Sequence, residues 1–394
     1  MCPLLAELLM KRILTITFLN FFISGGLRLA IPLLLLDRNV DLVEIGVVIS
    51  VLPIVFMVVR LLMAVIADLR GWNRFYILLN WPWSVLSTFV YFIASSTPMF
   101  LLGKFFEALK ESSYWAVSRT AIFSLSPNRE EKEATRNIAV SMLSTAVGSV
   151  AAGFGIAFFG FSFTLTILII TAALIAIPAA MLWKIPKQNL RQKNSRFREI
   201  INPRKRGKMF WFASVISVFF SLAFFPLLNL LLPVFMAQNI GYDYTTIGIA
   251  YMLYNFIASF VVLGTLRFSL GIKRVILQSS IALVATFMLA TSNYYFFAPF
   301  LALAVAQGLG WFFYESIIAK VTKNEPNVSV DIGLLIIPLR FAEFGSVLYA
   351  GIIAQSFGYW PLFVSSGLFF TFFSILASYF LRINDSSQRL SMKR

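Results

Sequence analysis

The sequence predicts an all-α membrane protein with twelve transmembrane helices, arranged as two pseudo-symmetric bundles of six with both termini in the cytoplasm. Three observations support this prediction. Hydrophobic residues fill 59% of the 394 positions and charged residues only 13%, whereas soluble domains carry about 25% charged residues. Apolar runs long enough to cross a bilayer alternate with short polar breaks. The second half of the chain repeats landmarks of the first half in the same order.

Composition also excludes several classes of site. The net charge of +16 could indicate nucleic acid, but no nucleic-acid-binding motif lies between the apolar runs. The chain has no His and a single cysteine, Cys2, which excludes the usual zinc and imidazole chemistry and an internal disulfide. We therefore expect no metal, no cofactor and no nucleic-acid partner.

Twelve runs of about 20 or more apolar residues are candidate spans. The first six are predicted at 13–36, 44–66, 75–95, 98–123, 135–160 and 162–183. The second six are predicted at 209–236, 245–266, 274–294, 296–319, 331–354 and 359–381. The breaks hold turn-forming residues such as Gly71, Gly241 and Gly358. We assign 1–183 and 209–383 to the two bundles, 184–208 to a basic linker and 384–394 to a tail.

Lys and Arg fall in alternate breaks, which sets the orientation. Both termini, the linker and every second loop are basic, whereas the opposite side holds essentially only Arg38. Because basic loops stay in the cytoplasm, the termini and linker are predicted to be cytoplasmic. The linker is interpreted first as a topology anchor and second as a contact for anionic lipid. We expect a multi-pass monomer of the cell membrane.

The two halves repeat each other at an offset of about 200 residues, which indicates an internal duplication. The matched pairs are Pro32 with Pro233, Gly46 with Gly248, Gly71 with Gly271, Tyr114 with Tyr314, Pro127 with Pro326, Gly148 with Gly345 and Gly160 with Gly358. Parallel six-span repeats place a substrate site near the middle of the membrane, between the halves, and reach it alternately from each side.

Residues 64–74 (AVIADLRGWNR), between the second and third spans, resemble the GxLaDRxGRR signature of the major facilitator superfamily. The counterpart at 264–274 keeps both glycines and the bases but has Phe268 in place of the acid. Residues 104–108 (KFFEA) resemble the RxxQGxG motif of the same family, with substitutions. The resemblance covers almost the whole chain and implies the twelve-helix fold of that family and transport by alternating access.

The resemblance also implies a latch at the cytoplasmic edge, in which an acid faces a helix terminus or a base. The residues implied are Asp68, Arg70, Gly71, Arg74 and Arg136, with Asp331 at the start of span eleven as a further partner. Without the repeat, these residues would be interpreted simply as a polar loop. Because the second half lacks the acid, we expect the latch to be concentrated on the first half.

Several ionisable residues lie inside predicted spans, where a charge costs about 2.5–3.5 kcal/mol on insertion scales and therefore marks a pathway or has a partner. Asn20, Ser24 and Arg28 form one polar stripe on span one. The deeper charges are Arg28, Lys104, Lys110 and Arg340 against Glu107, Glu111 and Glu343. Arg60 and Arg119 lie nearer the cytoplasmic ends and are expected to extend to the interface.

Two interpretations of the deep charges stay open. In the first, Lys104 with Glu107, Glu107 with Lys110, and Arg340 with Glu343 neutralise each other and only hold the bundle together. In the second, Glu107 or Glu111 carries a coupling proton as the cavity alternates between the two sides, since the chain has no His to do so. Further candidates for the lining are Tyr114, Trp115, Asn229, Tyr251, Tyr254, Asn255, Gln307, Trp311 and Tyr314.

The sequence therefore predicts a secondary transporter of a small organic solute, coupled to protons. Its aromatic residues favour export of amphiphilic compounds, which is the first hypothesis, and its buried cations favour uptake of an anionic metabolite, which is the alternative. For a sensor or scaffold that binds without transporting, we would expect an appended signalling domain. An enzyme is disfavoured, because the sequence has no metal motif, no nucleophile elbow and no His.

Overall fold

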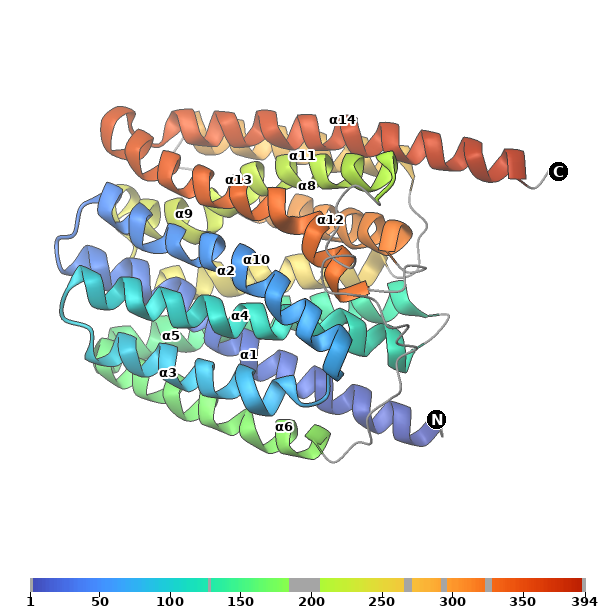
Figure 1. Ribbon diagram of the computed structural model, residues 1–394. Helices are drawn as coiled ribbons and strands as arrows, with labels where there is room; N and C mark the ends of the chain where they lie inside the picture. Colours follow the sequence, from blue (N-terminus) through green and yellow to red (C-terminus); the bar gives the residue numbers. More distant parts are fainter. Residues whose placement is uncertain are drawn as a thin grey trace.

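The computed structural model describes residues 3–126, 129–183, 206–265, 271–291, 296–322 and 328–391. Every regular element in these ranges is helical, so the predicted all-α class is confirmed. The helices run side by side as one bundle, and the chain begins and ends at the same end of it (Figure 1). We call this the cytoplasmic end, following the distribution of Lys and Arg, and the opposite one the outer end. Most of the predicted linker, 184–205, lies outside the described residues.

The helices follow the predicted spans closely. The first half contains α1 (Pro3–Asp37), α2 (Leu42–Arg70), η1 (Tyr76–Asn80), α3 (Trp81–Ile93), α4 (Thr97–Leu125), α5 (Glu130–Leu174) and α6 (Ala176–Trp183). The second half contains α8 (Lys208–Pro226), η3 (Leu227–Leu231), α9 (Leu232–Phe235), η4 (Met236–Ile240), α10 (Tyr244–Thr265), α11 (Ile272–Thr291), α12 (Phe297–Thr322), α13 (Val328–Phe357) and α14 (Trp360–Ser391). The π-helical segments η1, η3 and η4 adjoin regular helices of the same spans.

Ten described segments are long and apolar enough to cross a membrane. One of them, Lys132–Trp183, contains two predicted spans that meet at Gly160, whose φ of 81° turns the chain between them. The 29-residue helix α4 is absent from the ten because Lys104, Glu107 and further charges lower its hydropathy. Once these two features are included, each of the twelve predicted spans has a helical counterpart.

The polar breaks form compact turns. At the start of α2, the Asp41 carboxylate accepts a hydrogen bond of 2.7 Å from the backbone N–H of Glu44, which satisfies one of the free donors at the helix start. At its end, Gly71 has a φ of 89°, a conformation that L side chains rarely adopt. The turn predicted at Gly71 is therefore confirmed, and it requires glycine.

Two helix pairs join the halves: α2 packs against α13, and α5 packs against α10. At the outer end these pairs are in backbone contact. A Cβ on Gly153 of α5 would lie 2.7 Å from the Cα of Gly248 of α10. A Cβ on Gly351 of α13 would lie 2.7 Å from the carbonyl oxygen of Leu42. Only glycine permits this approach, so the two halves are held together tightly at the outer end.

The outer surface of the bundle is apolar, as a lipid environment requires. Large hydrophobic side chains such as Phe158, Phe159 and Phe357 are about two-thirds exposed, at 69%, 66% and 67%. Polar and charged side chains instead turn inward, and those of α4 are the clearest case: Lys104, Glu107 and Lys110 are all buried. This inversion of the arrangement in soluble proteins indicates a functional interior.

Candidate functional site

A cavity lies between the two halves. Helices α1, α2, α4 and α5 line it from the first half, and α8, η3, α10, α12 and α13 line it from the second. Its charged lining residues are Arg28, Lys104, Glu107, Glu111, Arg340 and Glu343. The position between the halves is the one that the internal repeat predicts.

Two ion pairs lie on opposite walls of the cavity. On α4, the Lys104 ammonium lies 2.8 Å from Glu107 Oε2, and this oxygen also accepts a 2.7 Å hydrogen bond from the Tyr91 hydroxyl. On α13, Arg340 Nη1 lies 2.5 Å from Glu343 Oε2. The Asn229 amide donates a longer hydrogen bond of 3.3 Å to Glu343 Oε1. Both pairs join residues three apart, as predicted.

The third acid, Glu111, pairs with Lys110, for which Glu107 was the expected partner. Lys110 Nζ lies 3.0 Å from Glu111 Oε1 and donates a 2.7 Å hydrogen bond to the Ser24 hydroxyl. Ser24 in turn donates to Glu111 Oε1 at 2.7 Å, and the Trp115 indole N–H donates to Oε2 at 3.1 Å. The predicted pairing of Lys110 with Glu107 is therefore wrong, because the fully buried Lys110 side chain reaches Ser24 of α1.

Arg28 is the cation left over from this pairing. It lines the cavity from α1 and is only partly buried. No described carboxylate lies within salt-bridge distance of it, and among the described residues it has no hydrogen-bond partner. Four cations, counting Lys110, thus face three carboxylates in and beside the cavity. The excess positive charge is located on a side chain that is open to the cavity.

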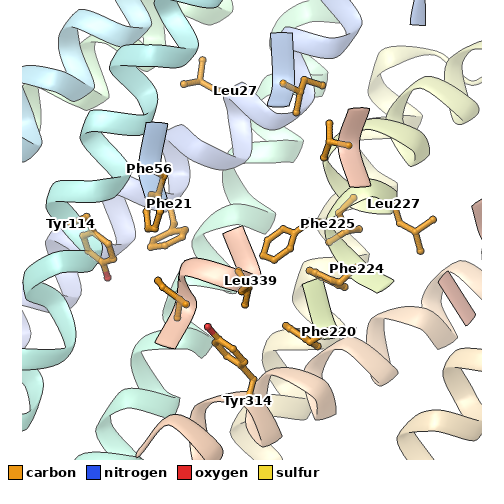
Figure 2. Packing of buried hydrophobic residues seen from close by; sticks show 14 of the residues in the cluster. Phe21, Leu27, Phe56, Tyr114, Phe220, Phe224, Phe225, Leu227, Tyr314 and Leu339 are labelled. Carbon is orange, nitrogen blue, oxygen red and sulfur yellow. The ribbon is translucent and has the colours of Figure 1, made fainter. Parts of the chain in front are cut away.

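Aromatic rings cover much of the remaining wall. Phe21 contacts Trp115 edge-on at 5.7 Å between ring centroids, and Phe224 contacts Trp311 in the same way at 6.3 Å. Arg340 lies between the halves, with its guanidinium carbon 4.1 Å from the centroid of Phe56 and 5.5 Å from that of Phe225. In the close view, the Phe21 and Phe56 rings of the first half lie together, and the Phe224 and Phe225 rings of the second half lie together apart from them (Figure 2). The cavity thus combines charge with flat apolar surface.

The predicted site residues divide into two groups. Those that line the cavity are Arg28, Lys104, Glu107, Glu111, Asn229, Asn255, Gln307, Trp311, Arg340 and Glu343. Asn20, Lys110, Tyr114 and Tyr254 are buried behind its wall. Tyr114, for example, shares hydrogen bonds with Thr17 at 2.7 Å and Asn137 at 3.2 Å. These four residues can support the cavity but do not face it.

Two lining helices were not expected from the sequence. Ile49, Leu52 and Pro53 of α2 and Ile138, Ser141, Met142 and Thr145 of α5 border the cavity. In sequence these positions belong to apolar runs that also suit lipid contact, so hydropathy does not single them out. The signal that could have found them is the pair of small residues Gly46 and Gly153, which bring α2 and α5 against the second half.

A cluster of buried charges lies between the halves on the cytoplasmic side of the cavity. Arg119 of α4 and Glu315 of α12 form a bidentate ion pair, in which Arg119 Nε donates to Glu315 Oε2 at 3.0 Å. Arg60 of α2 is 2% exposed and donates from Nη2 to the Trp115 carbonyl oxygen at 3.0 Å. The expectation that Arg60 and Arg119 extend to the interface is wrong, because both are buried where the halves meet.

Comparison with known proteins decides the family. A sequence profile described as Major Facilitator Superfamily matches residues 13–322. The chain belongs to the major facilitator superfamily. Members of this family are transporters rather than enzymes, and this one is a multi-pass membrane protein. No curated protein sequence matches the chain.

Solved structures with this fold include the human organic anion transporter MFSD10 (TETRAN). It is 14% identical, with a TM-score of 0.74, and the match covers 93% of this chain and 99% of that one. A single-residue variant of the E. coli fucose:proton symporter FucP is 13% identical, with a TM-score of 0.67 and coverage of 94% and 98%. FucP in the outward conformation is 14% identical, with a TM-score of 0.68 and the same coverage. At these identities the likeness is one of fold.

The residues implied for a cytoplasmic latch are only partly visible. Gly71 forms the turn described above, Arg74 stacks on the Trp183 ring at 4.9 Å, and Arg136 lies 3.7 Å from Glu133. The Asp68 and Arg70 side chains lie outside the described residues. Asp331, the implied partner at the start of span eleven, is buried and forms an ion pair with Arg206.

Proposed function

We propose that this superfamily member transports a small organic anion with an apolar, aromatic-sized body across the cell membrane, coupled to protons and by alternating access. The observation that carries the proposal is Arg28, a cation that is open to the cavity and has no carboxylate partner among the described residues. An uncompensated charge in a low-dielectric site attracts a ligand of the opposite sign. The aromatic wall supplies the surface for the rest of the solute.

This proposal combines the two versions of transport that the sequence leaves open. The rings of Phe21, Trp115 and Trp311 suit an amphiphilic solute, and the excess positive charge favours an anion among such solutes. Further support comes from the human organic anion transporter MFSD10, which shares this fold. The direction of net transport follows from the proton gradient rather than from the cavity itself.

The contacts of the acids support proton coupling. Each cavity carboxylate holds a cation: Glu107 holds Lys104, Glu111 holds Lys110, and Glu343 holds Arg340. A proton that binds to one of these acids releases its cation and raises the net positive charge of the cavity. Because an anion binds a more positive site more strongly, proton and anion favour each other's binding, which is the linkage that symport requires. We assign the coupling proton to Glu107 or Glu111.

Alternating access needs closure at each end, and the two ends differ. The outer end is closed by backbone contact at Gly153 and Gly248, the cytoplasmic end by the Arg119–Glu315 pair. The proposal includes a cytoplasmic latch at Asp68. This latch is expected mainly on the first half, because the counterpart of Asp68 in the second half is Phe268, which carries no charge. A charged seal can be opened by water at a lower cost than a packed apolar one, which makes the cytoplasmic side the more readily opened.

The test is a matched-pair screen. Purified protein is scanned for thermal stabilisation by aromatic carboxylates and by their neutral amides, at two pH values, and each hit is then followed by flux into proteoliposomes. We expect carboxylates but not amides to stabilise and to be transported, with uptake driven by an inward proton gradient. Transport of the amides alone would support a neutral amphiphile as substrate. No stabilisation and no counterflow in a broad library would favour a protein that does not transport.

A further inference from the structure

A second cation without an acidic partner lies beyond the cavity, on the cytoplasmic side. Arg60 of α2 is 2% exposed, and its one hydrogen bond to a described residue joins Nη2 to the carbonyl oxygen of Trp115 at 3.0 Å. Its Nε and Nη1 atoms are buried and have no hydrogen-bond partner in the described part of the chain. A buried guanidinium is normally paired with a carboxylate, because burying an unpaired charge is costly. Within the described part of the chain, Arg60 therefore lacks the partner its chemistry requires.

The charges around Arg60 do not supply that partner. Among the described residues, the charged groups that act on it are Arg119, Arg340 and Glu315. Glu315 is already held by both nitrogens of Arg119, and Arg340 is held by Glu343. Three arginines and two acids thus meet where the halves join, and the balance is positive.

Arg60 lies next to Arg340, on its cytoplasmic side. Both guanidinium groups contact the same ring, that of Phe56, with Arg340 at 4.1 Å and Arg60 at 5.8 Å from its centroid. Arg340 lines the cavity, whereas Arg60 lies one helical turn from Phe56 toward the cytoplasmic end of α2. From the outer end inward, Arg28, Arg340 and Arg60 form a series of cations, and among the described residues only Arg340 of these three has an acidic partner.

We propose that Arg60 is a second anion-binding site, which takes up the carboxylate or sulfonate of a small organic anion once the halves part at the cytoplasmic end. Only the identity of the natural ligand of this site rests on the proposed function. Its electrostatic character can be measured without transport. In this structure Arg60 lies beside the Phe56 ring and is bonded to Trp115, with Gly333 of α13 opposite it. Parting of α2 from α13 would expose Nε and Nη1 to water and to the anion leaving Arg340.

Gly333 of α13 provides a reporter position opposite Arg60. A Cβ at Gly333 would lie 3.9 Å from Arg60 Nη1 and 3.4 Å from Leu61 Cδ1, which are ordinary contacts, so a side chain can begin there beside Arg60. Cys2 is the only cysteine in the chain, and Cys2→Ser gives a clean background. The probes are sulfonatoethyl methanethiosulfonate, an organic anion, and its trimethylammonioethyl analogue, a cation of similar size, both added from the cytoplasmic side of membrane vesicles.

With Arg60 present, we expect the anionic reagent to modify Gly333→Cys at least about tenfold faster than the cationic one, relative to their rates with a free thiol. We also expect its rate to saturate with concentration, as binding before reaction requires. Arg60→Gln should reduce the rate ratio to near one and remove the saturation. Arg60→Lys should keep the preference, and Lys208→Gln, which alters an exposed base at the start of α8, should change neither.

The inference is overturned if Arg60→Gln leaves the rate ratio and the saturation unchanged, or if neither reagent reaches Gly333→Cys in a variant that purifies as a folded monodisperse protein. These results are independent of the flux assays. If labelling of Gly333→Cys is charge-selective and saturable in a protein that transports no carboxylate, the anion site stands and the proposed function is wrong. Carboxylate transport with no charge selectivity at Gly333→Cys would do the reverse.

Discussion

Arg119 of α4 and Glu315 of α12 form a buried, bidentate ion pair that joins the two halves of the molecule at the cytoplasmic end of the cavity. Their side chains are 7% and 3% exposed, so the pair is desolvated as long as the halves stay together. Opening toward the cytoplasm must break it and hydrate both ions. The pair therefore stabilises the state in which the cytoplasmic end is closed.

We predict that Arg119→Gln or Glu315→Gln alone impairs transport strongly, because removing one partner of a buried pair leaves an uncompensated charge at a cost of about 3–5 kcal/mol. Exchanging the two residues (Arg119→Glu with Glu315→Arg) should restore part of the activity. The measurement is a double-mutant cycle on flux and on cytoplasmic labelling of Gly333→Cys. Additive effects of the two single changes would show that the ions do not act as a pair.

Glu107→Gln or Glu111→Gln is predicted to uncouple transport from protons, because a carboxamide cannot bind the coupling proton. Uptake driven by a pH gradient should fall at least about tenfold in one of the two variants, whereas substrate exchange without a gradient continues. Glu7→Gln is the matched control, since this exposed acid lies near the start of α1 and does not line the cavity. Full gradient-driven uptake in both Gln variants would eliminate these acids as carriers.

Gly153→Ala is predicted to shift the protein toward the state that is open at the outer end. The added methyl group would lie 2.7 Å from Gly248 Cα and from the Tyr244 carbonyl oxygen, and backbone cannot move aside cheaply. Overpacking of this kind costs about 1–3 kcal/mol and acts only while the outer end is closed. We expect faster labelling of Ile49→Cys from the outer side. Gly345→Ala, which meets nothing within 4 Å, is the control; equal labelling in both would contradict the closure at Gly153.

Asp243, just before α10, is predicted to give stability that depends on pH. The Thr246 hydroxyl and backbone N–H hold the pKa of Asp243 below its usual value, and the N–H donates to Oδ1 at 3.2 Å. A lowered pKa in the folded state means that the stabilisation is complete above the ordinary carboxyl value and is lost as the pH falls through the lowered one. Asp243→Ala should cost about 1 kcal/mol near neutral pH, seen as a lower thermal midpoint in detergent. A midpoint difference that persists at about pH 2 to 3 would contradict this cause.

The helices and the position of the cavity could be predicted because they depend on local properties of the chain. Length and hydropathy define the spans, and the repeat at Gly46 and Gly248 implies two facing halves. The rotation of each helix about its axis was harder, since it is set by neighbours distant in sequence. The apolar face of α2 that carries Ile49 looks no different from one that faces lipid.

The partners of buried charges could be predicted only where both residues lie on one helix. Helical spacing predicts Lys104 with Glu107 and Arg340 with Glu343 correctly, since both residues of each pair lie on one helix. It cannot predict that Arg119 reaches across to Glu315, because that contact joins α4 to α12. Depth along a helix suggested that Arg60 reaches the interface, whereas packing of α2 against α13 buries it.

Arg28 is the group on which selection of an anion depends most directly in the proposed transporter. The deciding measurement is the initial rate of flux of a transported carboxylate and of its neutral amide in proteoliposomes, compared between the natural protein, Arg28→Gln and Arg28→Lys, with Lys273→Gln as the surface control. We predict that Arg28→Gln abolishes the preference for the carboxylate. Arg28→Lys should retain part of this preference, and Lys273→Gln should retain all of it. An undiminished preference for the carboxylate in Arg28→Gln would contradict selection of the anion by Arg28.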